Sequence, residues 1–521
     1  MKSTKNFIPH LASGFTLVAL LFCSAVQANS IKISGPLVSG GDVKDSTLGN
    51  SIIITPDNLT VVFLADKDID GVDELYSVPI DGSSPPIKLH EDLTSGSSVL
   101  TDFSVSADSS KVFFYISDGF PSIEGLYMSS VTTGGAQLIY DDFTGVFPQP
   151  PLSNSDGSRV VFLGNNNDGL GFFSTNTSDL VTTQLDTQTE DGIAFESGKL
   201  TPDGQTFIYS TINNIYSVPI VGGTPVLLSS GESESRFNLG YRISPDGSFI
   251  VFIAGQTAEN GPEIFSALID GSSLNKLNGL LSEGTQIGSG YRIDPTSSRV
   301  AFTAGRLFSN SIDGSDLRPI SRVGLDSSTF SEHAFNEDGS TVVYNAESTT
   351  FKVPTLGGAS VELTESGQSI GGYSVRPVSD VILGARLTVE CFAELVRINI
   401  ETTSARRVDC LPSLQKLETS PSLNSIGFSS FETIDTEGGL QLQLYVAGGE
   451  TTNPVSVLPF GEGDAFDFRL SSDDKYLIYM ADREIERQFE LFSIDLEEFF
   501  PDDSVCTAIK LPNGKVFPLC L

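Results

Sequence analysis

One pattern recurs along the chain from Thr55 to Leu496, and it constrains the fold more than any other feature. Each copy begins with a polar turn of the form Ser/Thr-Pro-Asp-Gly and continues into an apolar run, as in ISPDGSFIVFIAG from Ile243. A second run follows and ends in a glycine turn, as in NIYSVPIVGG from Asn214. Turn residues that bound β-branched and aromatic runs are typical of β-strands. Each copy therefore predicts a pair of strands with their turns.

The spacing of the copies predicts the architecture. The turn aspartate or its equivalent lies at Asp57, Asp108, Asp156, Asp203, Asp246, Thr296, Asp338 and Asp473, with weaker copies near Val378 and Ser422. The mean spacing of about 46 residues is the size of one four-stranded propeller blade. The sequence thus predicts an all-β fold, a β-propeller built from about ten four-stranded units. One large ring and two smaller rings both fit this number, because single propellers usually have four to eight blades.

The repeat also resembles a known family. The Ser/Thr-Pro-Asp-Gly turn, the strand LYSVPIDG from Leu75 and the Lys-Leu pair that ends a unit are similar to the WD40-like PD40 repeat of TolB-type β-propellers. The resemblance implies a propeller and, because TolB is an envelope partner protein, a role of that class. TolB also carries an N-terminal α/β domain, and no such domain precedes the blades here. We therefore do not expect TolB's own role.

The N-terminus has the order of a cleaved secretory signal. Lys2 and Lys5 precede an apolar run from Phe15 to Val26, and small residues follow up to Ala28. The apolar run is shorter than the roughly 20 residues that a membrane-spanning helix needs. We expect residues 1–28 to be removed and the mature protein to be periplasmic or secreted, with the propeller over residues 29–500.

A displaced strand is predicted just after the signal. KISGPLVSGGDV from Lys32 is similar to KLNGLLSEGTQI from Lys276, which lies between two interior repeats. Residues 31–43 therefore correspond to an outer strand followed by the approach to an inner strand. We expect this segment to complete the last blade, since closure of the ring removes exposed strand edges.

Four cysteines follow the signal, namely Cys391, Cys410, Cys506 and Cys520. An even number in an exported chain predicts two disulfides, and neither pair has the short spacing of a zinc site. Near the C-terminus, Pro512 and Gly514 suit a three-residue hairpin turn. Counting outward from this turn places Cys506 opposite Cys520. Residues 501–521 therefore predict a hairpin with a disulfide.

The net charge of the chain limits the kinds of molecule that it can bind. The formal net charge is −36, from 66 acidic and 30 basic residues. Such a surface repels the phosphates of nucleic acids and anionic lipids. It favours a basic partner or one that is bridged by cations, either a protein or an envelope glycan.

Few catalytic motifs are apparent. A Ser-His-Asp hydrolase needs a histidine base, and the chain after the signal contains only His90 and His333. No P-loop and no His-Glu-x-x-His motif occurs. We therefore expect no enzyme, but a protein- or glycan-binding module in the cell envelope or outside the cell. The alternative is a polysaccharide lyase or hydrolase that acts in the funnel of the propeller.

One loop has a metal-site pattern. LADKDIDGVDELY from Leu64 contains Asp-x-Asp-x-Asp-Gly-x-x-Glu, whereas other repeats carry unrelated loops at this place, so the fold itself does not require these aspartates. An oxygen-rich shell of this kind is what calcium prefers. The predicted ligands of a structural calcium ion are Asp66, Asp68, Asp70, Glu74 and the carbonyl of Val72. The alternative is a solvated polar turn.

Overall fold

A computed structural model describes most of the chain. The described residues are 30–45, 50–93, 96–119, 122–143, 149–166, 169–186, 193–229, 240–255, 262–279, 287–288, 290–322, 332–365, 368, 370–376, 381–386, 393–403, 405–411, 416–419, 425–433, 440–448, 455–456, 464–484, 487–499, 506–510 and 516–520. The predicted signal sequence and Cys391 lie outside the described residues.

The described strands form ten antiparallel sheets of four or five strands, numbered here in chain order, and one short hairpin. Sheet 1 contains β2 (Ile52–Ile54), β3 (Thr60–Ala65), β4 (Glu74–Pro79) and β5 (Ile87–Lys88). Sheet 2 contains β6 (Ser98–Val99), β7 (Ser104–Val105), β8 (Lys111–Ser117), β9 (Gly125–Ser130) and β10 (Gly134–Tyr140). Sheet 3 contains β11 (Leu152–Ser153), β12 (Arg159–Asn166), β13 (Gly169–Asn176) and β14 (Thr182–Gln184). Sheet 4 contains β15 (Ile193–Leu200), β16 (Thr206–Thr211), β17 (Ile215–Pro219) and β18 (Val226–Leu227). Sheet 5 contains β19 (Tyr241–Ile243), β20 (Phe249–Gly255), β21 (Pro262–Leu268) and β22 (Leu274–Lys276).

The second half of the chain continues in the same way. Sheet 6 contains β23 (Arg292–Ile293), β24 (Arg299–Thr303), β25 (Leu307–Ser311) and β26 (Arg318–Pro319). Sheet 7 contains β27 (His333–Phe335), β28 (Thr341–Ala346), β29 (Thr349–Pro354) and β30 (Val361–Glu362). Sheet 8 contains β31 (Gly371–Arg376), β32 (Val381–Arg386), β33 (Ala393–Asn399) and β34 (Ala405–Leu411). Sheet 9 contains β35 (Lys416–Thr419), β36 (Ser425–Thr433), β37 (Leu440–Gly448) and β38 (Val455–Ser456). Sheet 10 contains β39 (Ala465–Leu470), β40 (Tyr476–Ala481), β41 (Glu490–Asp495) and β1 (Ile31–Lys32), and a short helix, α1 (Leu496–Phe499), follows β41.

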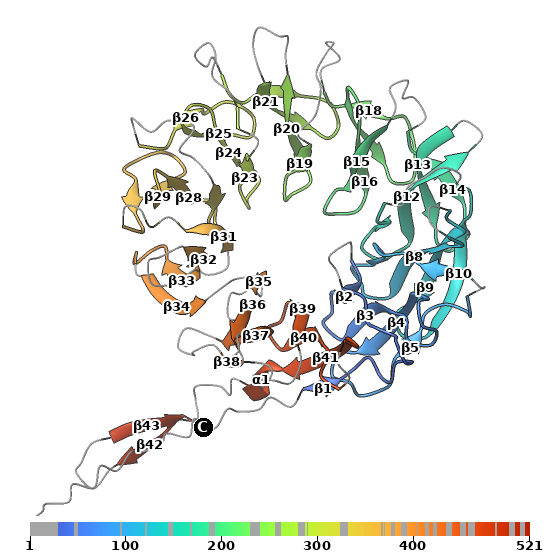
Figure 1. Cartoon of the computed structure of the whole chain (residues 1–521). Helices are drawn as coiled ribbons and strands as arrows, with labels where there is room; N and C mark the ends of the chain where they lie inside the picture. Colours follow the sequence, from blue (N-terminus) through green and yellow to red (C-terminus); the bar gives the residue numbers. More distant parts are fainter. Residues whose placement is uncertain are drawn as a thin grey trace, which may run out of the picture.

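Figure 1 shows these sheets side by side around one ring, with the first strand of each sheet nearest the centre and the last at the outside. The fold is therefore the predicted all-β propeller, and the sheets form one ring rather than two. We call the first strands of the sheets the inner rim, because they border the centre of the ring.

In the sheets where its residues are described, the repeated turn leads from a short inner strand into the next strand of the sheet. In sheet 4, Thr201 Oγ1 donates to Asp203 Oδ1 at 2.6 Å and accepts from the backbone N–H of Thr206 at 3.1 Å. Asp203 also accepts from the N–H of Gln205 at 3.0 Å, and both donors hold the pKa of Asp203 below its ordinary value. Gly204 adopts a φ of 67°, which favours glycine. The same hydroxyl-to-aspartate bond occurs at Thr55 and Asp57, Ser106 and Asp108, Ser244 and Asp246, and Ser471 and Asp473.

Aromatic pairs fill the space between neighbouring sheets. In eight of the sheets with described side chains, an aromatic residue of one middle strand lies opposite an aromatic residue of the strand that follows it, with ring centroids 5.2 to 6.1 Å apart. The pairs are Phe63–Tyr76, Phe114–Tyr127, Phe162–Phe173, Tyr209–Tyr216, Phe252–Phe265, Phe302–Phe308, Tyr344–Phe351 and Tyr479–Phe492. Cross-strand aromatic pairs stabilise a sheet beyond the area that they bury. The apolar run in each repeat is explained by this packing.

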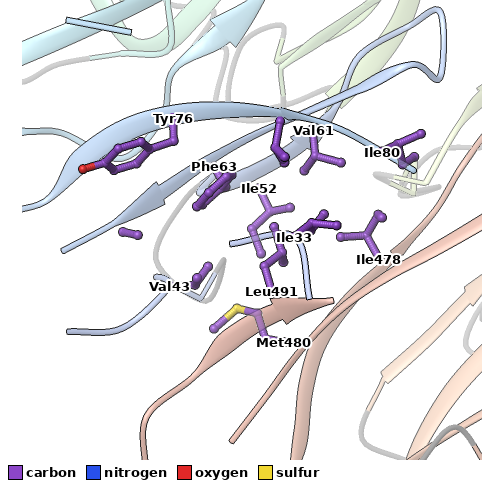
Figure 2. Close-up of a cluster of buried hydrophobic side chains, with 12 residues drawn as sticks. Ile33, Val43, Ile52, Val61, Phe63, Tyr76, Ile80, Ile478, Met480 and Leu491 are labelled. Atoms are coloured by element: carbon purple, nitrogen blue, oxygen red, sulfur yellow. The ribbon is translucent and has the colours of Figure 1, made fainter. Parts of the chain in front are cut away.

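The two ends of the chain meet where the ring closes. β1 pairs antiparallel with β41, and the N–H of Ile33 donates to the carbonyl of Leu491 at 2.8 Å. Ile33 and Leu491 then lie in a buried cluster that joins sheet 1 to sheet 10, with Phe63 and Met480 among its members (Figure 2). The displaced-strand interpretation of residues 31–43 predicts this pairing.

The repeated turns of the first and last sheets are also bonded to each other. The backbone N–H of Ser472 donates to Asn58 Oδ1 at 2.9 Å, and Asn58 Nδ2 donates to Ser472 Oγ at 2.8 Å. Contacts of this kind between residues 414 positions apart hold one closed ring.

The C-terminal hairpin is formed by β42 (Cys506–Lys510) and β43 (Val516–Cys520), which among the described strands pair only with each other. Cys506 lies opposite Cys520, which is the predicted register. The side chains of both cysteines lie outside the described residues, as does that of Cys410, so the two disulfides stay predictions.

Candidate functional site

The acidic loop between β3 and β4 holds the predicted calcium ligands. Asp66 is buried and uses both of its carboxylate oxygens within the chain. One accepts from the N–H of Asp42, and the other accepts from the N–H of Gly71 at 3.0 Å. Lys44 Nζ lies 3.5 Å from this second oxygen. Asp66 therefore fixes the loop against the N-terminal segment, while Asp70 is exposed.

Lys88, on the outer strand β5, interacts with two further predicted ligands. Its Nζ lies 2.8 Å from Asp68 Oδ2 and 2.8 Å from Glu74 Oε1. Glu74 is buried, and its other oxygen accepts from the hydroxyl of Tyr76 at 2.6 Å. Glu74 and Asp68 raise the pKa of Lys88 against the opposing effect of burial. An ammonium group thus provides positive charge between these carboxylates.

The Lys–Glu contact recurs in other sheets. Lys276 contacts Glu263 in sheet 5, and Lys32 contacts Glu490 in sheet 10. Each lysine lies opposite the aromatic residue that follows its glutamate by two positions. Glu74 therefore takes part in a Lys–Glu contact that several blades share, and this contact is not specific to the acidic loop.

Three of the five predicted ligands, Asp66, Asp68 and Glu74, have partners within the chain in this geometry. Among the described residues, no group of three or more His, Cys, Asp or Glu side chains is placed to hold a metal ion. Calcium binding at this loop stays a prediction from the sequence, and it requires Asp68 to turn away from Lys88.

The calcium prediction is checked by thermal unfolding in millimolar calcium and in chelator. It expects calcium to raise the melting temperature of the native chain but not that of Asp68→Ala, and an equal melting temperature in both solutions would contradict it.

His90 follows β5 and serves as a hydrogen-bonding residue of its blade. Its Nε2 accepts from the backbone N–H of Leu75 at 3.1 Å, so its Nδ1 carries the proton and donates to the carbonyl of Glu91 at 2.7 Å. The same backbone position is bonded in other sheets by Ser229, Asn278, Ser321 and Thr364. Residues without a titratable group thus perform the same role elsewhere, and the place of His90 needs no catalytic explanation.

His333 begins β27, and it makes a hydrogen bond that residues at the same position make in other sheets. Its Nε2 lies 3.2 Å from the carbonyl oxygen of Ala301 in the preceding sheet, so this nitrogen carries the proton. Tyr241 and Tyr291 make the equivalent bond from sheets 5 and 6, at 2.6 and 2.7 Å. Burial lowers the pKa of His333 to about 4. The imidazole is therefore neutral and structural.

A pentapeptide with the Gly-x-Ser-x-Gly spacing of hydrolase nucleophile motifs is present at residues 367–371. That motif requires a turn from a strand into a helix. Here Gly371 is the first residue of β31, and Ile370 is buried in an apolar cluster. Ser369 lies outside the described residues.

Three cations lie at equivalent positions of the inner rim in three consecutive sheets. We call Lys199 of β15, Arg242 of β19 and Arg292 of β23 the basic row. Each stands four positions before the residue at the turn aspartate position, in sheets 4, 5 and 6. Lys199 and Arg242 are exposed, and Arg292 is half-buried. β15, β19 and β23 border the centre of the ring (Figure 1), so the basic row belongs to the inner rim.

Lys199 and Arg242 extend toward the next sheet, whereas Arg292 donates to the carbonyl of Tyr291 in its own sheet at 3.2 Å. Lys199 Nζ lies 5.0 Å from the ring centroid of Tyr241 and donates to the carbonyl of Tyr241 at 2.9 Å. The guanidinium of Arg242 lies 5.4 Å from the ring centroid of Tyr291. Burial, followed by the charge of Arg242, lowers the pKa of Lys199. Cation–π contacts of this type hold the charged groups in place.

The row is confined to one arc of the rim. The equivalent residues of sheets 1, 2, 3 and 7 are uncharged, and they are Ile53, Ser104, Leu152 and Ala334. In sheet 10 the equivalent Arg469 is bonded to Asp467 at 2.6 Å. No carboxylate among the described residues forms an ion pair with Lys199 or Arg242. The propeller fold therefore does not require this positive charge, which lies within a chain of net charge −36.

The sequence matches no protein-family model and no curated protein. Among solved structures it is similar to an oligogalacturonate lyase in complex with manganese, with a TM-score of 0.33 and 16% identity over 65% of this chain and 86% of that chain. An oligogalacturonate lyase from Vibrio parahaemolyticus gives a TM-score of 0.34 and 14% identity over 66% and 88%. A eukaryotic initiation factor gives 0.47 and 9% over 74% and 93%. These similarities are too distant to bear on the site.

Among the described residues, no helix has the length and apolar character that crossing a membrane would need.

Proposed function

We propose that the protein is an exported binding module of the cell envelope or the surrounding medium, and that its ligand binds at the inner rim of the propeller. The basic row carries this proposal. Two exposed cations, Lys199 and Arg242, have no carboxylate partner among the described residues, and the three residues of the row occupy neighbouring sheets. Exposed charged groups that no opposite charge neutralises are a common feature of binding sites.

The scaffold suits binding. The inner strands are held by hydrogen bonds to their own sheets, and the tyrosines under the cations bond to the preceding sheet. A ligand would therefore meet charged groups that are already oriented, which lowers the entropy lost on binding. The net charge of −36 favours basic or cation-bridged partners on the outer surface. At the inner rim, the basic row favours an anionic ligand.

The alternative, a polysaccharide lyase or hydrolase, has less support. Each histidine of the mature chain makes a hydrogen bond that serine, asparagine or tyrosine makes in other sheets. Neither provides a free base beside the basic row.

The proposal is tested by retention of envelope polymers on the immobilised mature chain. We compare the native protein with the triple variant Lys199→Gln, Arg242→Gln, Arg292→Gln, after checking that both are folded. The native chain should retain protein or polysaccharide from an envelope extract that the triple variant does not. Equal retention by the two chains would contradict a ligand site at the inner rim.

A further inference from the structure

We infer that the ligand of the basic row is an acidic oligosaccharide, a linear glycan that carries carboxylates on successive sugars. This inference rests on the proposed function and specifies its ligand. It follows from the arrangement of the cations, from the length of the strands that hold them and from the charge of the rest of the chain.

The arrangement favours a linear polyanion. The row places one cation in each of three adjacent sheets, rather than several donors around one point. Sheets that pack face to face lie about 10 Å apart, so a compact anion can meet only one or two of these groups. A polymer with a carboxylate on each sugar can meet the whole row. Arg242 retains guanidinium N–H groups for a carboxylate while its guanidinium carbon lies over the ring of Tyr291.

The inner strands favour a glycan over an acidic peptide. Extended peptides commonly bind by adding a strand to a sheet edge, and this needs an edge of several residues. β19 has three residues and β23 has two, so two of the three edges are too short for such pairing. Recognition at the row must then depend on side chains. Side-chain recognition suits a sugar polymer, which presents carboxylates and hydroxyls but no backbone amides.

The charge of the chain disfavours nucleic acid. Duplex nucleic acid is a wide and dense polyanion, and it would approach the outer surface of a protein with 66 acidic and 30 basic residues. A single glycan chain is slender and can lie along the inner rim with its carboxylates directed at the row.

The test uses the intact mature chain and alginate oligomers as the probe, in low salt with chelator, with affinity measured by calorimetry. Arg242→Gln and Lys199→Gln should each weaken binding by about tenfold or more, as loss of a charge-assisted hydrogen bond does. Arg318→Gln is the matched control. It removes the same charge from β26, the outer strand of sheet 6, where Arg318 is half exposed and bonded to Asp316. This control should bind like the native chain.

The arms of the experiment separate the outcomes. Carboxyl-reduced alginate keeps the sugar chain but lacks the charge, and it should not bind. If reduced alginate binds equally well, or if neither rim variant weakens binding, the inference is wrong. If poly-glutamate binds more tightly than alginate with the same sensitivity to Arg242→Gln, the ligand is an acidic peptide. In that case the glycan assignment fails and the proposed rim site stands. The proposed function itself fails only if the native chain and the triple variant retain envelope polymers equally.

Discussion

A chain that lacks Lys32–Leu37 should melt at a clearly lower temperature than the native protein and should aggregate on heating. The free energy of unfolding of the closing sheet should fall by on the order of 5 kcal/mol. Three losses combine. The outer edge of β41 becomes unpaired, Ile33 leaves the cluster that joins sheets 1 and 10, and Glu490 keeps its buried carboxylate without Lys32.

The aggregation has a separate cause. An exposed strand edge next to apolar surface is a template for pairing with another chain. Deletion of residues 501–521 is the matched control, because the C-terminal hairpin pairs with none of the described strands of the ring. That deletion should leave the melting temperature unchanged. An unchanged melting temperature after loss of Lys32–Leu37 would show that β1 does not hold the ring closed.

Acid should destabilise the native chain through His333. The pKa of this residue is about 4 in the folded protein because of burial, with further lowering by Arg292 and Arg242, against an ordinary value of 6.5. Between these values the unfolded chain binds a proton that the folded chain does not. The contribution of His333 to the free energy of unfolding is therefore complete above pH 6.5. It is lost as the pH falls toward 4, and the total loss is about 3 kcal/mol.

His333→Gln isolates this contribution. Glutamine can donate the same hydrogen bond to the carbonyl of Ala301 but does not titrate. Denaturant unfolding of both chains between pH 8 and pH 4 should give a smaller loss of stability in the variant, by about 3 kcal/mol. His90→Gln is the control. Burial lowers the pKa of His90, but its hydrogen bond to Glu91 and the charge of Glu74 oppose this lowering, so a smaller change is expected. Parallel pH profiles of native and His333→Gln chains would contradict a neutral buried imidazole.

Much of the fold follows from local chemistry in the sequence. The turn around Asp203 needs a hydroxyl, a carboxylate and a residue with positive φ at fixed spacing, and each repeat that shows this pattern forms the turn. The N-terminal strand was also predictable, because KISG from Lys32 repeats KLNG from Lys276. The choice between one ring and two was not predictable. It depends on contacts such as that of Asn58 with Ser472, which no local pattern encodes.

The candidate site was harder to predict. The loop from Asp66 to Glu74 has a calcium pattern, but the contact of Lys88 with two of its carboxylates depends on the register of β4 and β5. The basic row was missed because the net charge of −36 hides a local excess of cations. A signal was present, since Lys199, Arg242 and Arg292 stand at the same distance before their turns. Their exposure at the inner rim became apparent only with the three-dimensional arrangement of the sheets.

The central claim is that cations of the inner rim bind an anionic ligand, and the most direct measurement is the affinity for alginate oligomers as a function of salt. Each cation that contacts the ligand contributes to the slope of log affinity against log salt, by up to about one. The slope should become shallower in Arg242→Gln and shallower still in the variant that lacks Lys199, Arg242 and Arg292, while Arg318→Gln keeps the native slope. A native slope in the triple variant would contradict the account, because the ligand would then bind elsewhere on the molecule.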